Sequence, residues 1–157
     1  MARFFDIDGA NAALGELRTI LETLRDERSQ LIALRDAFAR LTARATAPPG
    51  ESSGGESVVP DERPAPDAAD DPSPAAEDRR RLRLRMQGVI DQMQAGVARI
   101  DELGVTLREI ETGLIDFPAL VSGRQVWLCW RLGEGDVEWW HELSEGIGGR
   151  RPLAELV

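Results

Sequence analysis

The chain has 157 residues, of which 42% are hydrophobic, and a formal net charge of −9 at pH 7; this is the size of about one domain. Its one cysteine, Cys129, excludes an internal disulfide, so nothing indicates a secreted, disulfide-stapled fold. No apolar run approaches the roughly 18 residues of a membrane helix and the N-terminus has no apolar signal core, so we expect a cytoplasmic protein with no membrane partner.

The negative charge is concentrated in one segment. Residues 47–76 contain seven acidic residues, one arginine, many small residues and prolines, and almost no large apolar side chains. Such a segment cannot bury enough surface to offset its ordering entropy, so we predict a disordered acidic linker over 47–76. The rest of the chain is not basic either, and we therefore expect no nucleic-acid partner.

Residues 1–46 are predicted to form a long helix. Asp8 is its expected N-cap, because a short polar side chain before an apolar-periodic segment satisfies free backbone N–H groups. The apolar stripe slips in phase once, where Glu27 or Arg28 takes the buried position, as in a locally over- or underwound coiled coil. The stripe consists of Leu14, Leu17, Leu21, Leu24, Leu31, Leu34, Phe38 and Leu41.

Residues 77–104 are predicted to form a second helix, which ends at Gly104. Gly88 and Gly96 interrupt it near its apolar face, which suggests close approach to the first helix. Together the two helices predict an antiparallel coiled-coil hairpin, which could self-associate or bind a protein partner. The stripe of the second helix consists of Leu82, Met86, Val89, Met93, Val97 and Ile100.

A cluster of five arginines lies at the start of the second helix, where the helix dipole disfavours positive charge. In an antiparallel hairpin this end lies beside the C-terminal end of the first helix, where the same charges become favourable. We prefer this interpretation, or simple solvation, to an anion-binding patch. The cluster consists of Arg79, Arg80, Arg81, Arg83 and Arg85.

Residues 105–157 contain all four tryptophans and are predicted to form a β region with a C-terminal tail. Alternating apolar residues between turn signals predict strands over 105–110, 114–121, 124–132 and 137–142. Residues 146–152 are expected to form a loop and 153–157 a short helical turn. The fold class is therefore α+β: a helical hairpin followed by a three- or four-stranded antiparallel meander.

The turns predict which side chains share a face of the sheet. A two-residue turn at Ser122-Gly123 places Asp116 opposite Cys129. A symmetrical second turn over 133–136 would place Trp140 opposite Cys129 and His141 opposite Leu128. His141 would then face the helices together with the apolar side chains.

The other face would carry two tryptophans beside charged side chains, which is unusual for a surface that contacts only solvent. Arg131 would pair with Glu138, and Arg108 could reach Asp116. The predicted interaction surface consists of Trp127, Trp140, Arg131 and Asp116.

The strongest chemical alternative is a site for one divalent transition metal. Its candidate ligands are Cys129, His141, Asp116 and Glu134, which offer sulfur, nitrogen and oxygen donors. The expected register puts Cys129 and His141 on opposite faces, and a one-residue shift in the second hairpin would be needed to bring them together. Cysteine catalysis with His141 as the base would need the same shift.

Several short segments carry a resemblance to a known family. They are Glu102-Leu103-Gly104-Val105, Gly113-Leu114-Ile115-Asp116-Phe117-Pro118, Leu128-Cys129-Trp130, Gly133-Glu134, Trp140-His141 and Gly149-Arg150. In this order and spacing, the chain resembles the bacterial family of domain of unknown function 2203. The resemblance implies the helix–helix–β architecture and no activity. From the residues we therefore expect a non-enzymatic protein-interaction module without a cofactor, with a metal- or thiol-dependent protein as the alternative.

Overall fold

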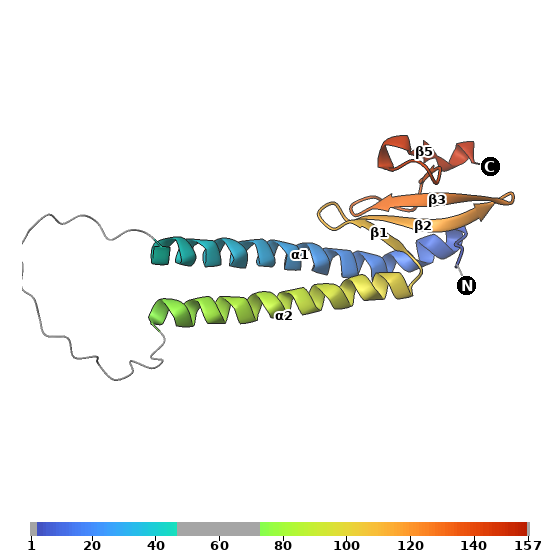
Figure 1. Ribbon diagram of the computed structural model, residues 1–157. Helices are drawn as coiled ribbons and strands as arrows, with labels where there is room; N and C mark the ends of the chain where they lie inside the picture. Colours follow the sequence, from blue (N-terminus) through green and yellow to red (C-terminus); the bar gives the residue numbers. More distant parts are fainter. Residues whose placement is uncertain (1–2, 47–72, 157) are drawn as a thin grey trace, which may run out of the picture.

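A computed structural model describes residues 3–46 and 73–156 of the chain. It contains two helices packed side by side, followed by a five-stranded antiparallel sheet (Figure 1). The predicted α+β class is confirmed. The predicted disorder of the linker concerns residues that lie, for the most part, outside the described ranges. No helix in the described ranges is long and apolar enough to cross a membrane.

Helix α1 spans Ile7–Thr46. Its N-cap is Asp6 rather than Asp8: the Asp6 carboxylate accepts a hydrogen bond from the Gly9 backbone at 2.6 Å, and the Asp6 carbonyl accepts one from Ala10 at 3.0 Å. The inner half of the predicted stripe is fully buried, with exposed fractions of 2% or less at Leu14, Leu17, Leu21 and Leu24.

Helix α2 spans Pro74–Glu102. Ser73 caps it by accepting a hydrogen bond from the Ala76 backbone at 3.2 Å. The helix therefore begins three residues earlier than predicted. The predicted linker, which ended at residue 76, was correspondingly too long. Gly104, with φ of +82°, follows the helix as predicted.

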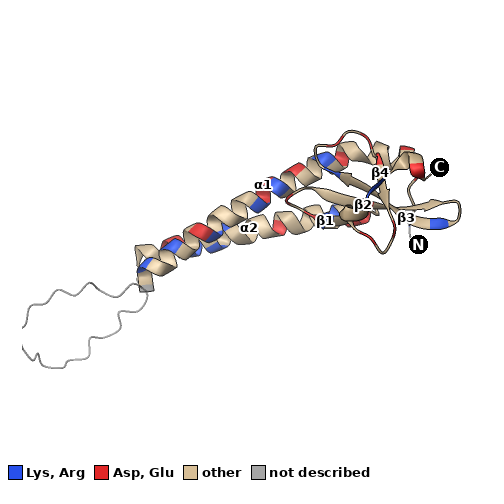
Figure 2. Cartoon of the chain, turned by 90° about the horizontal axis from the view of Figure 1, so that it is seen from above, with Lys and Arg blue, Asp and Glu red and all other residues tan. Residues whose placement is uncertain are grey.

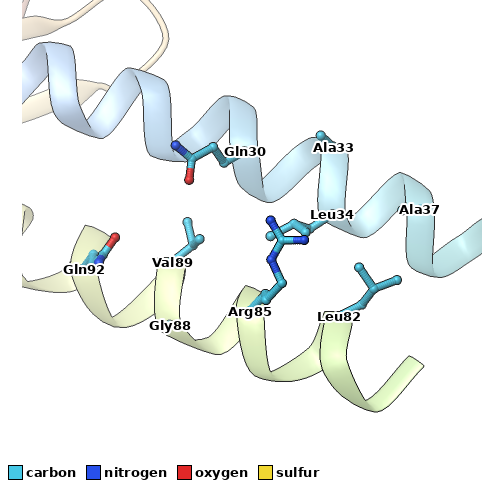
Figure 3. A pocket seen from close by; sticks show the side chains of 9 residues that line it. All are labelled: Gln30, Ala33, Leu34, Ala37, Leu82, Arg85, Gly88, Val89 and Gln92. Atoms are coloured by element: carbon cyan, nitrogen blue, oxygen red, sulfur yellow. The ribbon is translucent and has the colours of Figure 1, made fainter. Parts of the chain in front are cut away.

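The two interior glycines of α2 differ in their surroundings. A Cβ atom at Gly96 would lie 3.0 Å from Leu24 Cδ2, which confirms the close helix approach there. A Cβ atom at Gly88 would meet nothing within 4 Å. In the outer half of the hairpin, Gly88 lies on an opening between the helices that small Ala33 and Ala37 side chains also line (Figure 3). The hairpin is therefore tightly packed at its inner end and looser at its outer end.

The sheet consists of neighbouring strands in sequence order: β1 (Thr106–Glu109), β2 (Leu114–Val121), β3 (Arg124–Arg131), β4 (Trp139–His141) and β5 (Arg151–Pro152). The fifth strand was missed, because two residues that include a proline give no strand signal. Short 3-10 helices follow β4 and β5, η1 over Ile147–Gly149 and η2 over Leu153–Glu155. The second of these confirms the predicted helical turn.

The sheet separates two layers. The N-terminal part of α1 lies on one side of β2 and β3, and the segment that contains β5 lies on the other side (Figure 1). The helix-facing side is the core, where Phe117, Leu128 and Trp130 are completely buried. The C-terminal segment therefore covers the part of the opposite side that contains Asp116 and Cys129, whereas Leu120, Gln125 and Arg131 on the same side are exposed.

The first predicted hairpin register is confirmed and the second is wrong. Asp116 lies opposite Cys129, as expected. In the second hairpin, however, Trp140 lies opposite Leu128 and His141 opposite Trp127, one residue away from the symmetrical arrangement. Because side chains alternate across a sheet, this shift moves Trp140 into the core and His141 to the opposite face.

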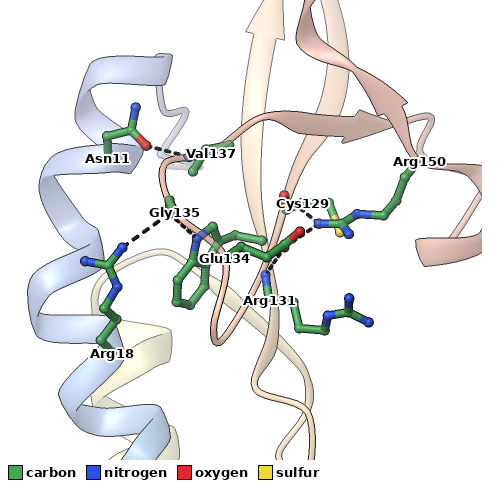
Figure 4. A network of polar contacts seen from close by, with 9 residues as sticks. Asn11, Arg18, Cys129, Arg131, Glu134, Gly135, Val137 and Arg150 are labelled. Atoms are coloured by element: carbon green, nitrogen blue, oxygen red, sulfur yellow. Dashed lines mark hydrogen bonds and ion pairs between the residues drawn. The ribbon is translucent and has the colours of Figure 1, made fainter.

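The physical reason lies in the loop between β3 and β4, which contacts with α1 and contacts within the hairpin hold in an asymmetric shape (Figure 4). Asn11 of α1 accepts a hydrogen bond from the Val137 backbone at 2.7 Å. The Gly135 carbonyl accepts one from the Trp130 indole at 2.9 Å, and the Glu134 carboxylate accepts one from the Arg131 backbone at 2.7 Å. The burial of Trp140 in place of the smaller, polar His141 favours the same register.

Candidate metal centre

Three side chains with metal-ligating atoms come together on the face of the sheet away from the helices. Asp116, Cys129 and His141 lie on the adjacent strands β2, β3 and β4, and their ligand atoms all lie within 4.8 Å of one another. Their exposed fractions are 2%, 1% and 1%. The one-residue shift of the second hairpin brings His141 to the side of the other two.

The His141 ring is oriented by two contacts. Its Nδ1 atom lies 2.8 Å from the Glu142 carbonyl oxygen, and its Nε2 atom lies 3.0 Å from Oδ2 of Asp116. A carbonyl oxygen can only accept, so Nδ1 carries a hydrogen, and in a neutral ring the Nε2 lone pair then faces a carboxylate oxygen. This second contact is favourable only when a proton or another cation lies between the two atoms.

The Asp116 carboxylate is partnered on one oxygen only. Oδ2 accepts a hydrogen bond from Arg108 Nε at 2.8 Å, as predicted from the sequence, and also faces His141. Oδ1 is buried and has no hydrogen-bond partner among the residues that the structure describes. A buried carboxylate oxygen without a partner is costly and requires an explanation, such as a bound ion.

The Cys129 thiol is protonated at neutral pH. Burial, together with the nearby negative charge of Asp116, raises its pKa from 9.0 to about 12 despite the opposing effect of Arg150. The thiolate is the form that acts as a nucleophile. The surroundings of Cys129 therefore do not suit the cysteine-nucleophile alternative, whereas a metal ion that replaces the proton would stabilise the thiolate directly.

A small cavity of about 230 Å³ opens in front of two of these side chains. The sheet supplies one wall, which includes Asp116 and Cys129, and the segment after β4 supplies the other, which includes Glu145. Within the described ranges, Oε2 of Glu145 is buried without a hydrogen-bond partner. A Cβ atom at Gly149 would lie 2.7 Å from this oxygen, so a glycine is needed beside it. Sequence reasoning missed Glu145, because only the folding of the tail over the sheet brings it near the site.

Glu134, the fourth ligand predicted from the sequence, has a different role. Its carboxylate pairs with Arg150 Nη2 at 2.5 Å and accepts the Arg131 backbone hydrogen bond (Figure 4). The Arg150 guanidinium also lies 5.1 Å from the centre of the Trp139 ring. Glu134 thus links the β3–β4 loop to the C-terminal segment and is not grouped with the three ligand atoms.

The predicted interaction surface is largely internal. Trp140 is 2% exposed and belongs to the core, and Asp116 is buried in the candidate site. Trp127 is half-buried, with the Arg108 guanidinium 5.0 Å from its ring centre. Arg131 is exposed, but the expected pair with Glu138 is absent from the ion pairs of the described residues. The β3–β4 register is shifted by one residue and its pairing does not extend beyond Cys129 and Trp139.

Comparison with known proteins identifies a family but no activity. The family model described as "Uncharacterized conserved protein (DUF2203)" matches residues 3–153. No curated protein matches the chain, and no solved structure matches it.

Proposed function

The chain belongs to the DUF2203 family, whose description assigns no activity. From the site itself, we propose that this chain is a small metal-binding protein. It would hold one divalent transition metal ion through Asp116, Cys129 and His141. The observation that carries the proposal is the contact of His141 Nε2 with Asp116 Oδ2 at 3.0 Å, next to the unpartnered Oδ1. A metal ion would accept the ring lone pair and neutralise the carboxylate. This proposal replaces the interaction module as the leading interpretation.

The donor set suits zinc or a similar ion. Carboxylate oxygen, thiolate sulfur and imidazole nitrogen are all zinc ligands, with bonds of about 2.0–2.3 Å, which place neighbouring ligand atoms of a tetrahedron roughly 3.5 Å apart. The ligand atoms here lie within 4.8 Å of one another, so we expect side-chain rotations to bring them onto one ion. Nδ1 of His141 contacts the Glu142 carbonyl, and a metal-bound histidine typically donates its other ring N–H to a backbone carbonyl or carboxylate in this way.

Three protein ligands leave one position of a tetrahedral ion for water or a substrate, which is the arrangement of catalytic rather than structural zinc. The cavity of about 230 Å³ lies beside Asp116 and Cys129 and is smaller than the roughly 300–1,000 Å³ of ordinary ligand pockets. We therefore expect water or a molecule of only a few heavy atoms as the fourth ligand. Glu145 lines the same cavity, and its Oε2 atom, which has no partner among the described residues, could accept a hydrogen bond from such a ligand.

The test is the metal content of the untagged, full-length protein purified without chelators, measured by elemental mass spectrometry. We expect close to one transition metal ion per wild-type chain, and a large loss in each of Asp116→Asn, Cys129→Ser and His141→Ala. Asp136→Asn is the matched control, since Asp136 is an exposed aspartate on the neighbouring loop. Circular dichroism reports whether each variant is folded.

Two results would contradict the proposal. One is a wild-type protein that contains no transition metal and does not take up added Zn²⁺. The other is a metal content that the three ligand variants leave unchanged, because the ion would then be bound elsewhere.

A further inference from the structure

The middle of the helical hairpin carries an apolar groove, which extends toward both ends and which nothing covers in the part of the chain the structure describes. The groove runs along one side of α1 and α2, and the structure places Leu31, Ile32, Met86, Ile90, Met93 and Val97 along it. Ile32 and Val97 are 36% and 38% exposed. A contiguous apolar surface of this kind usually marks an interaction site.

The two ends of the hairpin carry opposite net charges. The outer end, over 29–46 and 74–88, contains eight arginines and three acidic residues, which leaves +5. The inner end, over 7–28 and 89–102, contains four arginines and eight acidic residues, which leaves −4. Figure 2 shows both kinds of charge along the helices that carry the groove.

We propose that this groove binds a second copy of the same chain, packed antiparallel to the first. Antiparallel packing places the positive outer end of each hairpin on the negative inner end of the other, and the two-fold symmetry repeats this favourable contact. Parallel packing would place like charges together at both ends. Leu31 and Ile90 line the middle of the groove, and each would meet its own copy near the two-fold axis of a four-helix assembly.

The groove side of each end carries charges suited to this contact. Arg79 and Arg83 precede Met86 and Ile90 by seven residues, so they lie on the same side of α2. At the inner end, Asp101 lines the groove, and Glu111 lies 3.7 Å from Arg28, which also lines it. The arginine cluster thus has a partner of opposite charge that is available in every copy of the chain.

The test uses charge reversal at each end of the full-length chain, with sedimentation equilibrium as the measurement. One variant is Arg79→Glu with Arg83→Glu, and the other is Asp101→Arg with Glu111→Arg. We expect wild-type dimers, a dissociation constant at least tenfold higher for each variant alone, and recovery of dimers in their equimolar mixture. The loss in each variant alone is specific to antiparallel packing, because in parallel packing each end would meet its own copy and a reversal would leave like charges opposite each other. Recovery in the mixture then shows that the loss comes from charge and not from misfolding.

Arg81→Glu with Arg85→Glu is the matched control. Arg85 lines the opening on the other side of the helix pair, so this variant should change the dissociation constant less than threefold, and circular dichroism verifies the helical content of all variants. A wild-type chain that stays monomeric at its highest soluble concentration would overturn the proposal. So would dimers that the groove-side reversals leave intact, or a mixture that fails to recover.

Discussion

His141 Nε2 lies 3.0 Å from Asp116 Oδ2, and both side chains are almost completely removed from solvent. Because Nδ1 of the same ring faces the Glu142 carbonyl, the lone pair of Nε2 in a neutral ring faces the carboxylate. The Cys129 thiol carries a proton at neutral pH. A metal ion bound at this site would accept the ring lone pair and take the place of the thiol proton.

Zinc binding is therefore expected to release close to one proton at pH 7, the proton of the Cys129 thiol. Titration calorimetry of the metal-free protein with Zn²⁺, in buffers that differ in ionisation enthalpy, measures this number. Cys129→Ser should lower it by about one proton, whereas Asp136→Asn should leave it unchanged. Binding without proton release would show that the ion is held by groups other than these.

The Cys129 thiol should be inert in the metal-free folded protein. Its pKa of about 12 leaves almost no thiolate at pH 7.5, so a disulfide reagent should modify it only as fast as the chain unfolds. Rapid modification under native conditions would contradict this. Addition of urea provides the control, since the unfolded chain should react at once.

The same raised pKa makes stability depend on pH in the alkaline range. Below about pH 9 the folded and unfolded chains both hold the thiol proton; between about 9 and 12 the unfolded chain releases it and the folded chain keeps it. The thiol's contribution to the free energy of unfolding therefore falls as pH rises through this range. Urea titrations of the metal-free protein at pH 8 and 10.5 should show a larger loss for the wild type than for Cys129→Ala.

Two glycines in turns should respond differently to substitution by alanine. Gly113 has φ of +66°, and its Cβ atom would lie 2.5 Å from Leu132 Cβ, so Gly113→Ala should lower the free energy of unfolding by about 3 kcal/mol from backbone strain and overpacking. Gly123 has φ of +79° but open space around it, and Gly123→Ala should lose only about 1 kcal/mol. Equal losses in urea titrations would contradict the packing at Gly113.

Asn11 should stabilise both the fold and the metal site. Asn11→Ala leaves the buried Val137 N–H without its 2.7 Å acceptor, which should cost about 1–2 kcal/mol in urea unfolding. We also expect weaker zinc binding, because this loop sets the register that places His141. Asn11→Asp keeps an acceptor oxygen and should retain most of the stability and affinity; a loss equal to that of Asn11→Ala would exclude the hydrogen bond as the cause.

The parts of the fold that depend on local signals could be predicted from the sequence. The helices follow from their apolar periodicity, and the first hairpin register follows from the Ser122-Gly123 turn, where both residues have positive φ as a two-residue hairpin turn requires. The N-cap was placed two residues late, because Asp6 and Asp8 are both suitable capping residues.

The second hairpin could not be predicted because its determinants are distant in sequence. Asn11 contacts Val137 across 126 residues, and Arg18 contacts Gly135 across 117. These contacts make the loop asymmetric and shift the register by one residue. The predicted register put Cys129 and His141 on opposite faces of the sheet, and the same shift places them on one face. The folded C-terminal segment brings Glu145 near them. The candidate ligands were thus identifiable by residue type, whereas their convergence required the tertiary structure.

The most direct test of the proposed metal site is the absorption spectrum of the protein after one equivalent of Co²⁺ has been added to the metal-free form. Direct coordination by Cys129 predicts a thiolate-to-cobalt charge-transfer band in the near ultraviolet for the wild type, no such band for Cys129→Ser, and an unchanged band for Asp136→Asn. A folded wild-type protein that binds Co²⁺ without this band, or binds none, would contradict coordination by Cys129 and with it the three-ligand site.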